Sequence, residues 1–571
     1  MGLTFLYWYV RVYKRGPCIL DWYDKAIVYQ IYPKSFQDTN DDGIGDLQGV
    51  ITHLDYIKNL GFNTIWLNPI FVSPQVDNGY DVSNYFAIDP ILGDMDDFTE
   101  MMKKAHHLGL HIILDLPINH TSDQHPWFKD AVNNPNSIFK DYYIWHKQVD
   151  GHEPNNWGSF FGGSVWEKNP NDPEEYYFHL FDKRMPDLNW KNPEVRKSIA
   201  DIAKFWIEKG VDGFRLDAFI HIAKANLEQN SLIQGEQFPA DDTFYAKLPK
   251  VKDYLATFVR EIKDFKSDIF LFGEASSANA LNAAEYTRPD EDGCDVVVNS
   301  GNYGEVYDDS NPDVPGFFQT RRLSLDSLKK TYVTWESVLA DISLPTLTWG
   351  NHDISRLRDR LNLPVDNEDV SKLLATLMYL QRGMPIIYYG EEIGMHGLKY
   401  QQVSDFDDQR AVDLIKTLRE KSFTDEEILT LLNNQDEMTA RGPMQWDDSQ
   451  YRGFSTKEPW NWGQTDETNV STELKDSKSL AAFYKSLLSV KKHNCFTNGD
   501  YQLLITDPEI YAYLRQTRDN KGIVVTNFSN KVKKITLPEA KWKKVLANKV
   551  KLTNNELTLD PWGSCALESK K

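Results

Sequence analysis

The sequence predicts an α/β fold whose largest part is a (β/α)8 TIM barrel, and two observations predict it. Short apolar runs rich in β-branched and aromatic residues alternate with amphipathic stretches of helical length, which is the pattern of a parallel sheet covered by helices. There are eight such runs, the number of strands that closes this kind of barrel. The predicted strands are Ala26–Pro33, Thr64–Ile70, His111–Leu116, Gly210–Asp217, Ile269–Glu274, Val296–Asn299, Thr346–Asn351 and Pro385–Tyr389.

Two connections between these strands are too long to be simple loops. Residues 119–186, after the third strand, are rich in Trp, Asn, Pro and Gly. They are predicted to form an inserted subdomain, since structureless loops of this length are rare. Residues 391–455, after the eighth strand, are predicted to form a second, partly helical excursion.

The sequence pattern at the end of the chain is typical of an antiparallel sheet. From residue 486 onward, turn residues separate short apolar strand patterns, which predicts a C-terminal antiparallel β-domain. The predicted strands are Tyr501–Ile505, Ile510–Arg515, Gly522–Asn527 and Leu557–Leu559.

These patterns divide the chain into four parts. Residues 22–118 and 187–485 form the barrel, residues 119–186 the inserted subdomain, and residues 486–571 a C-terminal β-sandwich. Residues 1–21 begin like a signal peptide, but their basic residues follow the apolar stretch and no small-residue cleavage site appears. We interpret them as a leader of unclear role.

The overall charge and composition exclude several classes of protein. A formal net charge of −21 opposes binding to nucleic acid or anionic lipid, because phosphates must be neutralised by Lys and Arg. No run approaches the ~20 apolar residues that cross a bilayer. The four cysteines lie far apart without CxxC spacing, so neither a disulfide framework nor a zinc site is indicated. A cytoplasmic protein acting on a small neutral substrate without an organic cofactor is expected, and the oligomeric state stays open.

Three carboxylates follow three of the predicted strands. Asp217 ends the fourth strand, Glu274 ends the fifth, and Asp353 follows the seventh. Catalytic residues of a (β/α)8 barrel lie at these strand ends, so the three should meet at one mouth. Period-two geometry places Arg215 on the same face as Asp217, where the cation should keep that carboxylate ionised. The apolar run before Glu274 predicts a raised pKa, which suits a general acid.

Each of these carboxylates alone has an ordinary explanation. A strand-end Asp or Glu is a helix cap or an ion-pair partner about 70% of the time. Three together weaken that explanation, because glycoside cleavage needs a nucleophile, an acid/base and a stabilising partner. His120 and His352 also lie beside strand ends. Because they are near these carboxylates, we expect both histidines to contact sugar hydroxyls.

Four segments at these strand ends resemble the signature regions of the α-amylase superfamily, glycoside hydrolase family 13. Two more motifs, Asp77–Asp81 and Gly442–Trp446, resemble the group of oligo-1,6-glucosidases and α-glucosidases (maltases) within it. The resemblance covers residues 22–571. The four segments are Asp115–His120, Gly213–Ala218, Phe272–Glu274 and Asn351–Asp353.

The resemblance implies a role for each of these residues. Asp217 would be the nucleophile, Glu274 the acid/base and Asp353 the stabiliser of the transition state. Asp77 and Arg441 would bind the non-reducing end of the substrate and block longer chains, which gives exo action. The −1 sugar subsite would be lined by Tyr80, His120, Phe181, Arg215 and His352.

Two departures from the family pattern affect the substrate site. Met185 stands where a glutamine is usual, so one polar sugar contact is expected to be absent. Residues 436–440, before Arg441, read Asp-Glu-Met-Thr-Ala, where a further Arg and Asp are common.

A loop after the first strand resembles a calcium site. Its alternating oxygen ligands resemble the start of an EF-hand loop, but position twelve is Gly49, so the bidentate Glu is missing. A polar turn without an ion explains the same pattern. Similar glucosidases often hold calcium here, which makes structural Ca²⁺ the expectation. The predicted ligands are Asp38, Asn40, Asp42, Ile44 and Asp46.

The expected activity is exo-acting, retaining hydrolysis of terminal α-glucosidic bonds in short oligosaccharides. In similar enzymes Val after the nucleophile accompanies α-1,6 preference and Ala or Thr accompanies α-1,4 cleavage, so Ala218 predicts preference for maltose-type bonds. A small residue needed only for packing is the alternative explanation of Ala218. An isomaltase, or a transglycosylase or sucrose isomerase, remains an alternative, and a phosphorylated disaccharide fits the acidic chain less well. A non-catalytic binding protein, like the amylase-type ectodomains that accompany transporters, would lack the catalytic carboxylates present here.

Overall fold

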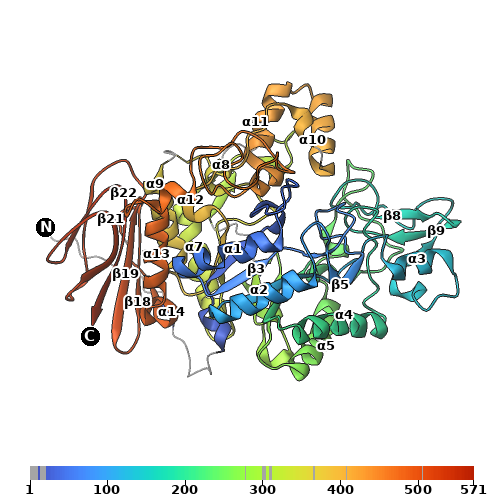
Figure 1. Cartoon of the computed structure of the whole chain (residues 1–571), viewed down its shortest axis with the longest axis horizontal. Coiled ribbons are helices and arrows are strands. Elements are labelled where there is room, and N and C mark those ends of the chain that lie inside the picture. The colour runs from blue at the N-terminus through green and yellow to red at the C-terminus, as the bar shows by residue number, and fades with distance from the viewer. Residues whose placement is uncertain are drawn as a thin grey trace.

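The structure is a computed structural model with three parts side by side (Figure 1). The antiparallel sheet lies at one end, the barrel in the middle and the inserted subdomain at the other end. The described residues are 11–12, 21–276, 278–298, 304–307, 311–363, 367–406, 408–504 and 506–570.

The predicted (β/α)8 barrel is confirmed. Eight parallel strands follow the order β12-β11-β10-β6-β3-β2-β16-β15. The two end strands are joined by the Thr346 hydroxyl, which donates to the Val297 carbonyl at 3.2 Å. The strands are β2 (Val28–Ile31), β3 (Thr64–Leu67), β6 (His111–Pro117), β10 (Gly213–Asp217), β11 (Phe270–Glu274), β12 (Val296–Val298), β15 (Thr346–Leu347) and β16 (Met384–Tyr388).

Helices surround the strands, and most of them begin at side-chain caps. Asp46 caps α1 by accepting from the Gly49 amide, and Asn192 caps α4 before a proline in its first turn. The barrel helices are α1 (Leu47–Leu60), α2 (Met95–His107), α4 (Pro193–Glu208), α5 (Pro249–Phe265), α6 (Ala280–Tyr286), α7 (Leu325–Leu339), α9 (Glu368–Tyr379) and α13 (Leu480–Lys491).

The strands are buried on both faces, which explains their continuous apolar runs. One apolar cluster fills the barrel interior with residues such as Trp66, Ile113 and Phe272. A larger cluster lies between the strands and the helices. The N-terminal end of the barrel is therefore packed, and polar side chains gather at the carboxyl ends of the strands.

The segment between β6 and α4 contains a small sheet of its own, at the right of Figure 1. Lys224, on the barrel, makes a buried ion pair of 2.7 Å with Asp187 at the end of the segment. Its elements are α3 (Pro126–Asn133), β7 (Trp145–Lys147), β8 (Trp166–Asn169) and β9 (Asp172–Phe178), in the sheet order β7-β9-β8.

The excursion after β16 contains α10 (Gln409–Glu420) and α11 (Asp425–Gln435), which pack around their own apolar cluster above the barrel (Figure 1). Thr424 and Glu427 form a capping box at the start of α11. The shorter elements are β4 (Phe71–Val72), β5 (Asn84–Ile88), β13 (Glu305–Tyr307), β14 (Arg321–Leu323), α8 (Leu357–Arg360), α12 (Val470–Glu473) and α14 (Asn494–Asn498).

The C-terminal antiparallel β-domain is also confirmed, as one hydrogen-bonded sheet of order β1-β17-β18-β19-β22-β20, with β21 paired to β22. Because β22 changes neighbours along its length, the sheet bends around a core of its own. The sandwich assignment and the domain boundaries stay predictions. The strands are β1 (Arg11–Val12), β17 (Asp500–Leu504), β18 (Ile510–Gln516), β19 (Asn520–Asn527), β20 (Lys533–Thr536), β21 (Lys543–Thr553) and β22 (Glu556–Lys570).

Most of the predicted leader, residues 1–21, lies outside the described residues, as do Asn299 and Ile505 at the ends of predicted strands. Within the described part of the chain, no helix combines the length and the apolar character needed to span a bilayer.

Candidate active site

The barrel strands bring the predicted carboxylates to one rim. Asp217 and Glu274 are the last residues of β10 and β11, and Arg215 is in register with Asp115 of β6. Asp353 follows β15 in the next loop. Parallel strands end at the same edge, so side chains that are distant in sequence become neighbours.

A single buried cation holds three of these carboxylates. Nη1 of Arg215 donates to Asp115 Oδ1 and to Asp217 Oδ1, both at 2.7 Å, and Nη2 lies 3.0 Å from Glu274 Oε2. Glu274 also accepts from the Ser276 hydroxyl at 2.8 Å and from the Ala218 amide at 3.1 Å. Arg215 therefore fixes the relative positions of the two residues predicted to do the chemistry.

These contacts correct the expected protonation of the pair in the unliganded enzyme. Burial raises the pKa of Asp217 well above its ordinary value, although Arg215 opposes the effect. Burial also acts on Glu274, but Arg215, Ser276 and the Ala218 amide together hold the pKa of Glu274 below its ordinary value. The sequence-based expectation was the reverse, because it assigned the cation to Asp217 alone.

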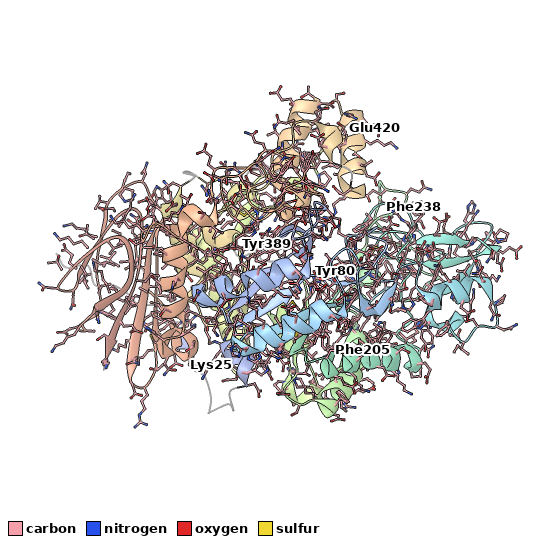
Figure 2. All side chains as sticks on the ribbon, in the orientation of Figure 1. Lys25, Tyr80, Phe205, Phe238, Tyr389 and Glu420 are labelled. Atoms are coloured by element: carbon pink, nitrogen blue, oxygen red, sulfur yellow. The ribbon has the colours of Figure 1, made fainter. Side chains whose placement is uncertain are left out.

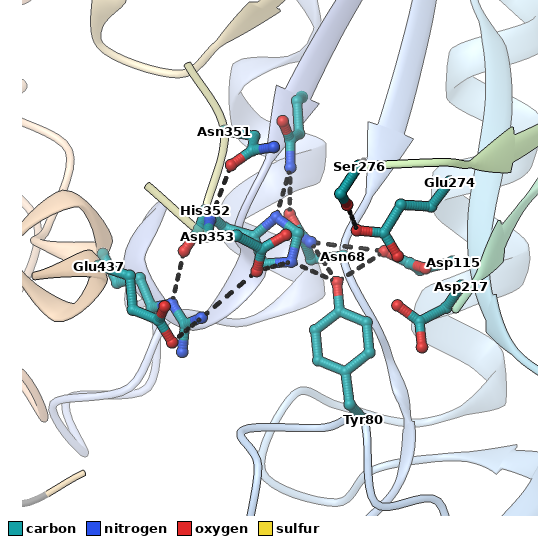
Figure 3. Close-up of polar contacts among 12 residues, drawn as sticks. Asn68, Tyr80, Asp115, Asp217, Glu274, Ser276, Asn351, His352, Asp353 and Glu437 are labelled. Atoms are coloured by element: carbon teal, nitrogen blue, oxygen red, sulfur yellow. Dashed lines mark hydrogen bonds and ion pairs between the residues drawn. The ribbon is translucent and has the colours of Figure 1, made fainter. Parts of the chain in front are cut away.

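A second group of polar side chains connects Asp115 to Asp353 (Figure 3). The Tyr80 hydroxyl donates to Asp115 Oδ2 at 2.8 Å and lies 2.5 Å from His352 Nε2. His352 Nε2 is 3.1 Å from Asp353 Oδ1, and its Nδ1 is 3.0 Å from the Gln30 amide. Burial raises the pKa of Asp353 to about 7 and that of Asp115 to about 6.

Arg441 reaches the same rim from the excursion after β16. Its Nε donates to the His352 carbonyl at 2.8 Å, and its Nη2 lies 3.2 Å from Glu437 Oε1 and 3.6 Å from Asp353 Oδ1. Asp77 faces the same space, and no described residue donates a hydrogen bond to its carboxylate. Burial raises the pKa of Asp77 well above its ordinary value. A sugar hydroxyl would supply the missing partner.

A cavity of ≈ 830 Å³ opens over these groups. Figure 2 places Tyr80 near the middle of the molecule. Arg215 and His352 are not on the cavity surface but lie buried directly beneath it. The other predicted site residues line the cavity: Asp77, Tyr80, His120, Phe181, Asp217, Ala218, Glu274, Asp353 and Arg441.

His120 has a polar atom available for a ligand. Its Nε2 is buried and has no hydrogen-bond partner among the described residues, and its ring meets Phe181 edge to face. Burial lowers the pKa of His120 to about 4, so the ring is neutral at pH 7. Met185 is fully buried and does not reach the cavity.

The sequence analysis missed much of the outer wall of the cavity. Pairs of adjacent phenylalanines in loops could have indicated this wall, because exposing two large apolar side chains to water is unfavourable and often marks a binding surface. Phe161 and Phe317 both lie against the Arg410 guanidinium, which binds Glu437 at 2.6 Å. The lining residues that were not predicted include Phe160, Phe161, Ile220, His221, Glu236, Asp242, Ser276, Phe317, Phe318, Arg410, Asp413 and Glu437.

Ala218 lines the cavity from a turn just beyond the end of β10. Its backbone is left-handed, with φ of 50°. This turn aims its amide at Glu274. A β-branched residue would be strained in this conformation.

The predicted calcium loop is a tightly bonded turn. Asp38, Asn40 and Asp42 each accept from the amide two residues further on, at 2.8–3.0 Å. Asp38 also accepts from the Asp41 and Gly43 amides and from the Ser455 hydroxyl, which saturates its carboxylate. Asp46 caps α1. In the part of the chain that the structure describes, no three Asp, Glu, His or Cys side chains gather as a metal site. The turn explains the pattern without an ion, and calcium stays a prediction.

Removal of calcium tests that prediction. If the Asp38 loop binds Ca²⁺, excess chelator should lower the melting temperature with little direct effect on chemistry, since an ion bound only to the native state stabilises it by mass action. Thermal unfolding with chelator, and with calcium added back, measures this. An unchanged melting curve after exhaustive dialysis against chelator would show that the loop works without the ion.

Comparison with known families matches nearly the whole chain. The model described as "Alpha amylase, catalytic domain" matches residues 30–499. A second model, "Alpha-amylase SusG C-terminal domain", matches residues 510–565.

Individual proteins match over their full lengths. The chain is 37% identical to an oligo-1,6-glucosidase of Parageobacillus thermoglucosidasius, over 95% of this chain and 98% of that one. It is 36% identical to a trehalose-6-phosphate hydrolase of Bacillus subtilis (strain 168), over 95% and 97%. A solved structure described as a "Family GH13_31 enzyme" superimposes with a TM-score of 0.88 at 46% identity, over 96% of this chain and 100% of that one.

Proposed function

The chain belongs to the α-amylase family of glycoside hydrolases, and from this premise we propose that it is an exo-acting, retaining α-glucosidase of short oligosaccharides. One observation carries the proposal: Arg215 holds Asp217 and Glu274 together at the floor of a cavity that Asp353 also faces. Retaining glycosidases act on one sugar with two carboxyls that lie ~5–5.5 Å apart. A single guanidinium that binds both carboxyls is compatible with such a short separation.

In the proposed mechanism Asp217 attacks the anomeric carbon while Glu274 protonates the leaving oxygen. A glucosyl ester forms on Asp217, and Glu274 then takes a proton from the water that hydrolyses it. Asp353 would hold sugar hydroxyls as positive charge develops on the ring, and the buried, neutral His352 would orient Asp353 from beneath the cavity. Burial raises the pKa of Asp217 and the contacts of Glu274 lower its pKa, so the acid step needs a proton on Glu274 that the unliganded pair does not favour, and the two groups titrate as one unit.

The charge of the cavity favours a neutral sugar over a phosphorylated one. Arg410 and Arg441 are the cations among the described lining residues, and both already bind Glu437. A phosphate would meet unfavourable acidic groups. The trehalose-6-phosphate hydrolases among the relatives therefore give a weaker guide to the substrate than the oligoglucosidases do. The acidic lining residues are Asp77, Asp217, Glu236, Asp242, Glu274, Asp353, Asp413 and Glu437.

Preference for α-1,4 bonds is the finer part of the proposal. Ala218 borders the leaving-group side beside Glu274, where two extra methyl groups would crowd the ring of an α-1,4 leaving sugar. We expect maltose to be cleaved in preference to isomaltose. Ala218→Val should lower the ratio of kcat/KM values, maltose over isomaltose, by ~10-fold or more.

A second variant shows whether the left-handed backbone at this position affects the ratio by itself. Ala218→Gly accepts the left-handed conformation and adds no bulk, so it should leave the ratio unchanged. If the parent enzyme already prefers isomaltose, or if Val leaves the ratio as it was, the isomaltase alternative replaces this one. The relatives named as oligo-1,6-glucosidases make that alternative the main competitor.

A transglycosylase or sucrose isomerase would use the same intermediate with a sugar as acceptor. Products from sucrose and from concentrated maltose distinguish transfer from hydrolysis.

We also propose a cytoplasmic location, which the buried free thiols of Cys294, Cys495 and Cys565 support.

The proposed function is tested by one substrate panel. Maltose, isomaltose, trehalose and sucrose are incubated separately, and released glucose is followed over time. Maltose should give the highest kcat/KM. Failure to release glucose from any of the four, by enzyme shown to be folded, would contradict the proposal.

A further inference from the structure

Lys34 lies outside the predicted site but contacts the loop that forms one wall of it. It belongs to η2 (Pro33–Ser35), the turn directly after β2, and is 8% exposed. Its ammonium donates to Gln75 Oε1 at 3.0 Å and to Asn78 Oδ1 at 2.9 Å. The same ammonium lies 4.1 Å from the centroid of the Trp460 ring.

The two residues that Lys34 binds are the strained residues of that loop. Gln75 has φ of 65° and Asn78 has φ of 49°, so both are non-glycine residues in the left-handed region. Asp77 lies between them, and Tyr80 follows two residues after Asn78. Strained backbone persists only where surrounding contacts over-determine it, and it often marks functional loops.

Tyr80 fixes the far end of the loop to the barrel through Asp115 and His352, but the contacts of the residues before it are mostly internal to the loop. Asp81 accepts from the Val76 and Asp77 amides at 3.0 Å, which shapes the turn without fixing it to the barrel. Asp89 accepts from the Gln75 side chain at 2.9 Å. Lys34 therefore supplies a direct link from a barrel strand to the residues that flank Asp77.

Ser35, the next residue of η2, contacts Arg441, the second residue predicted to bind the non-reducing end of the substrate. The Ser35 hydroxyl donates to the Arg441 carbonyl at 2.6 Å and accepts from Trp460 Nε1 at 3.0 Å. One turn after β2 thus contacts the loop of Asp77 through Lys34 and the backbone of Arg441 through Ser35.

We propose that Lys34 is a positioning residue that sets the Asp77 carboxylate against the non-reducing glucose. This inference rests on the proposed function and adds a residue to its substrate-binding apparatus. Lys34 does not touch the sugar. It acts through the backbone of residues 75–78, and its loss misplaces Asp77 while the Asp217–Glu274 pair stays in place.

The setting of Lys34 argues against a role in stability alone. No carboxylate lies within ion-pair distance of its ammonium in the described part of the chain, so neutral groups surround the charge. Burial lowers the pKa of Lys34 to about 8. A buried cation with neutral partners costs folding free energy, which a stabilising residue would not do.

The test compares Lys34→Met with a matched control, Lys491→Met. Lys491 is also buried and donates to two backbone carbonyls, but it lies between the barrel and the C-terminal sheet. Lys34→Met should lower kcat/KM for maltose by ~10–100-fold, since small misplacements of binding groups have effects of that size. Lys491→Met should stay within about twofold of the parent.

A double-mutant cycle with Asp77→Asn shows whether Lys34 acts through Asp77. Once Asp77 is disabled, adding Lys34→Met should change kcat/KM by less than about twofold, because coupled residues are not additive. A full second loss in the double variant, or a Lys34→Met enzyme within about twofold of the parent, would overturn the proposal.

Hydrogen exchange over residues 73–81 provides a readout that needs no substrate. Exchange there should accelerate in Lys34→Met and stay at the parent rate in Lys491→Met. If the parent hydrolyses no α-glucoside, the proposed function fails, while exchange still decides whether Lys34 holds the loop. Unchanged exchange in Lys34→Met would overturn the inference by itself.

Discussion

Asp217→Asn and Glu274→Gln should each lower kcat by ~10²–10⁴-fold or more, since either change removes one half of the acid/base and nucleophile pair. Asp217→Asn should not lower the melting temperature at neutral pH, whereas Glu274→Gln should lower it slightly, because the depressed pKa of Glu274 means that its ionised form stabilises the fold. For Asp217 the sign follows from its pKa, which is raised in the folded state, so ionised Asp217 opposes folding as pH rises and a neutral Asn does not. Loss of activity with an intact fold is the signature of a residue used for chemistry.

The two variants should respond differently to the leaving group. Glu274→Gln should recover much of its first step on an aryl α-glucoside, because a phenolate leaves without protonation. Asp217→Asn should not recover, since no acceptor for the glucosyl group remains. Glu392→Gln is the control, being a buried carboxylate that binds Tyr29 and Tyr56 away from the cavity, and its kcat should be unchanged. Near-normal activity in either folded active-site variant would contradict the assignment.

Arg215→Met should produce the largest combined loss of activity and stability. It leaves Asp115, Asp217 and Glu274 buried without their shared cation. Removing one member of a buried ion pair costs ~3–5 kcal/mol. Thermal or urea unfolding measures the loss, and hydrolysis of maltose should be undetectable.

The stability loss in Arg215→Met should depend on pH in one direction. Without the cation the folded-state pKa values of all three carboxyls rise: that of Asp115 above its value of about 6 in the parent enzyme, that of Asp217 further above its ordinary value, and that of Glu274 from below its own. The penalty is therefore absent where the groups are protonated in both states, below about pH 4, and grows as pH rises through the folded-state pKa values. A difference in melting temperature that is as large at pH 5 as at pH 8 would contradict this account.

Arg515→Met is the matched control for Arg215→Met. Arg515 is also fully buried and binds Glu336 and Gln381, but at the junction of the barrel and the C-terminal sheet. Its loss should destabilise the fold and leave kcat per folded molecule unchanged. The comparison separates the catalytic role of Arg215 from the general cost of breaking a buried ion pair.

The sequence predicted the barrel because its strands are buried on both faces and read as continuous apolar runs. β20 and β21 were not predicted, because lysines on exposed positions interrupt their apolar pattern, as at Lys534, Lys543 and Lys551. Their partner β22 was predicted only at Leu557–Leu559. Edge strands give a weak local signal, since pairing with a long neighbour determines their structure.

The carboxylates at strand ends were predictable for the same reason that the barrel was, because strand position fixes the rim. Contacts that depend on loops were not. Arg410 and Lys34 carry no motif by themselves, and their partners lie at least 27 residues away in sequence. The protonation of Asp217 and Glu274 was mistaken because the sequence does not show that Arg215 binds both carboxylates.

The anomeric form of the first product tests the central claim most directly. Maltose hydrolysis is followed by proton NMR within the first minutes, before mutarotation equalises the anomers. Double displacement on Asp217 predicts that α-glucose appears first and that β-glucose grows in later. Initial release of β-glucose would mean direct attack by water, and it would contradict the assignment of Asp217 as the nucleophile.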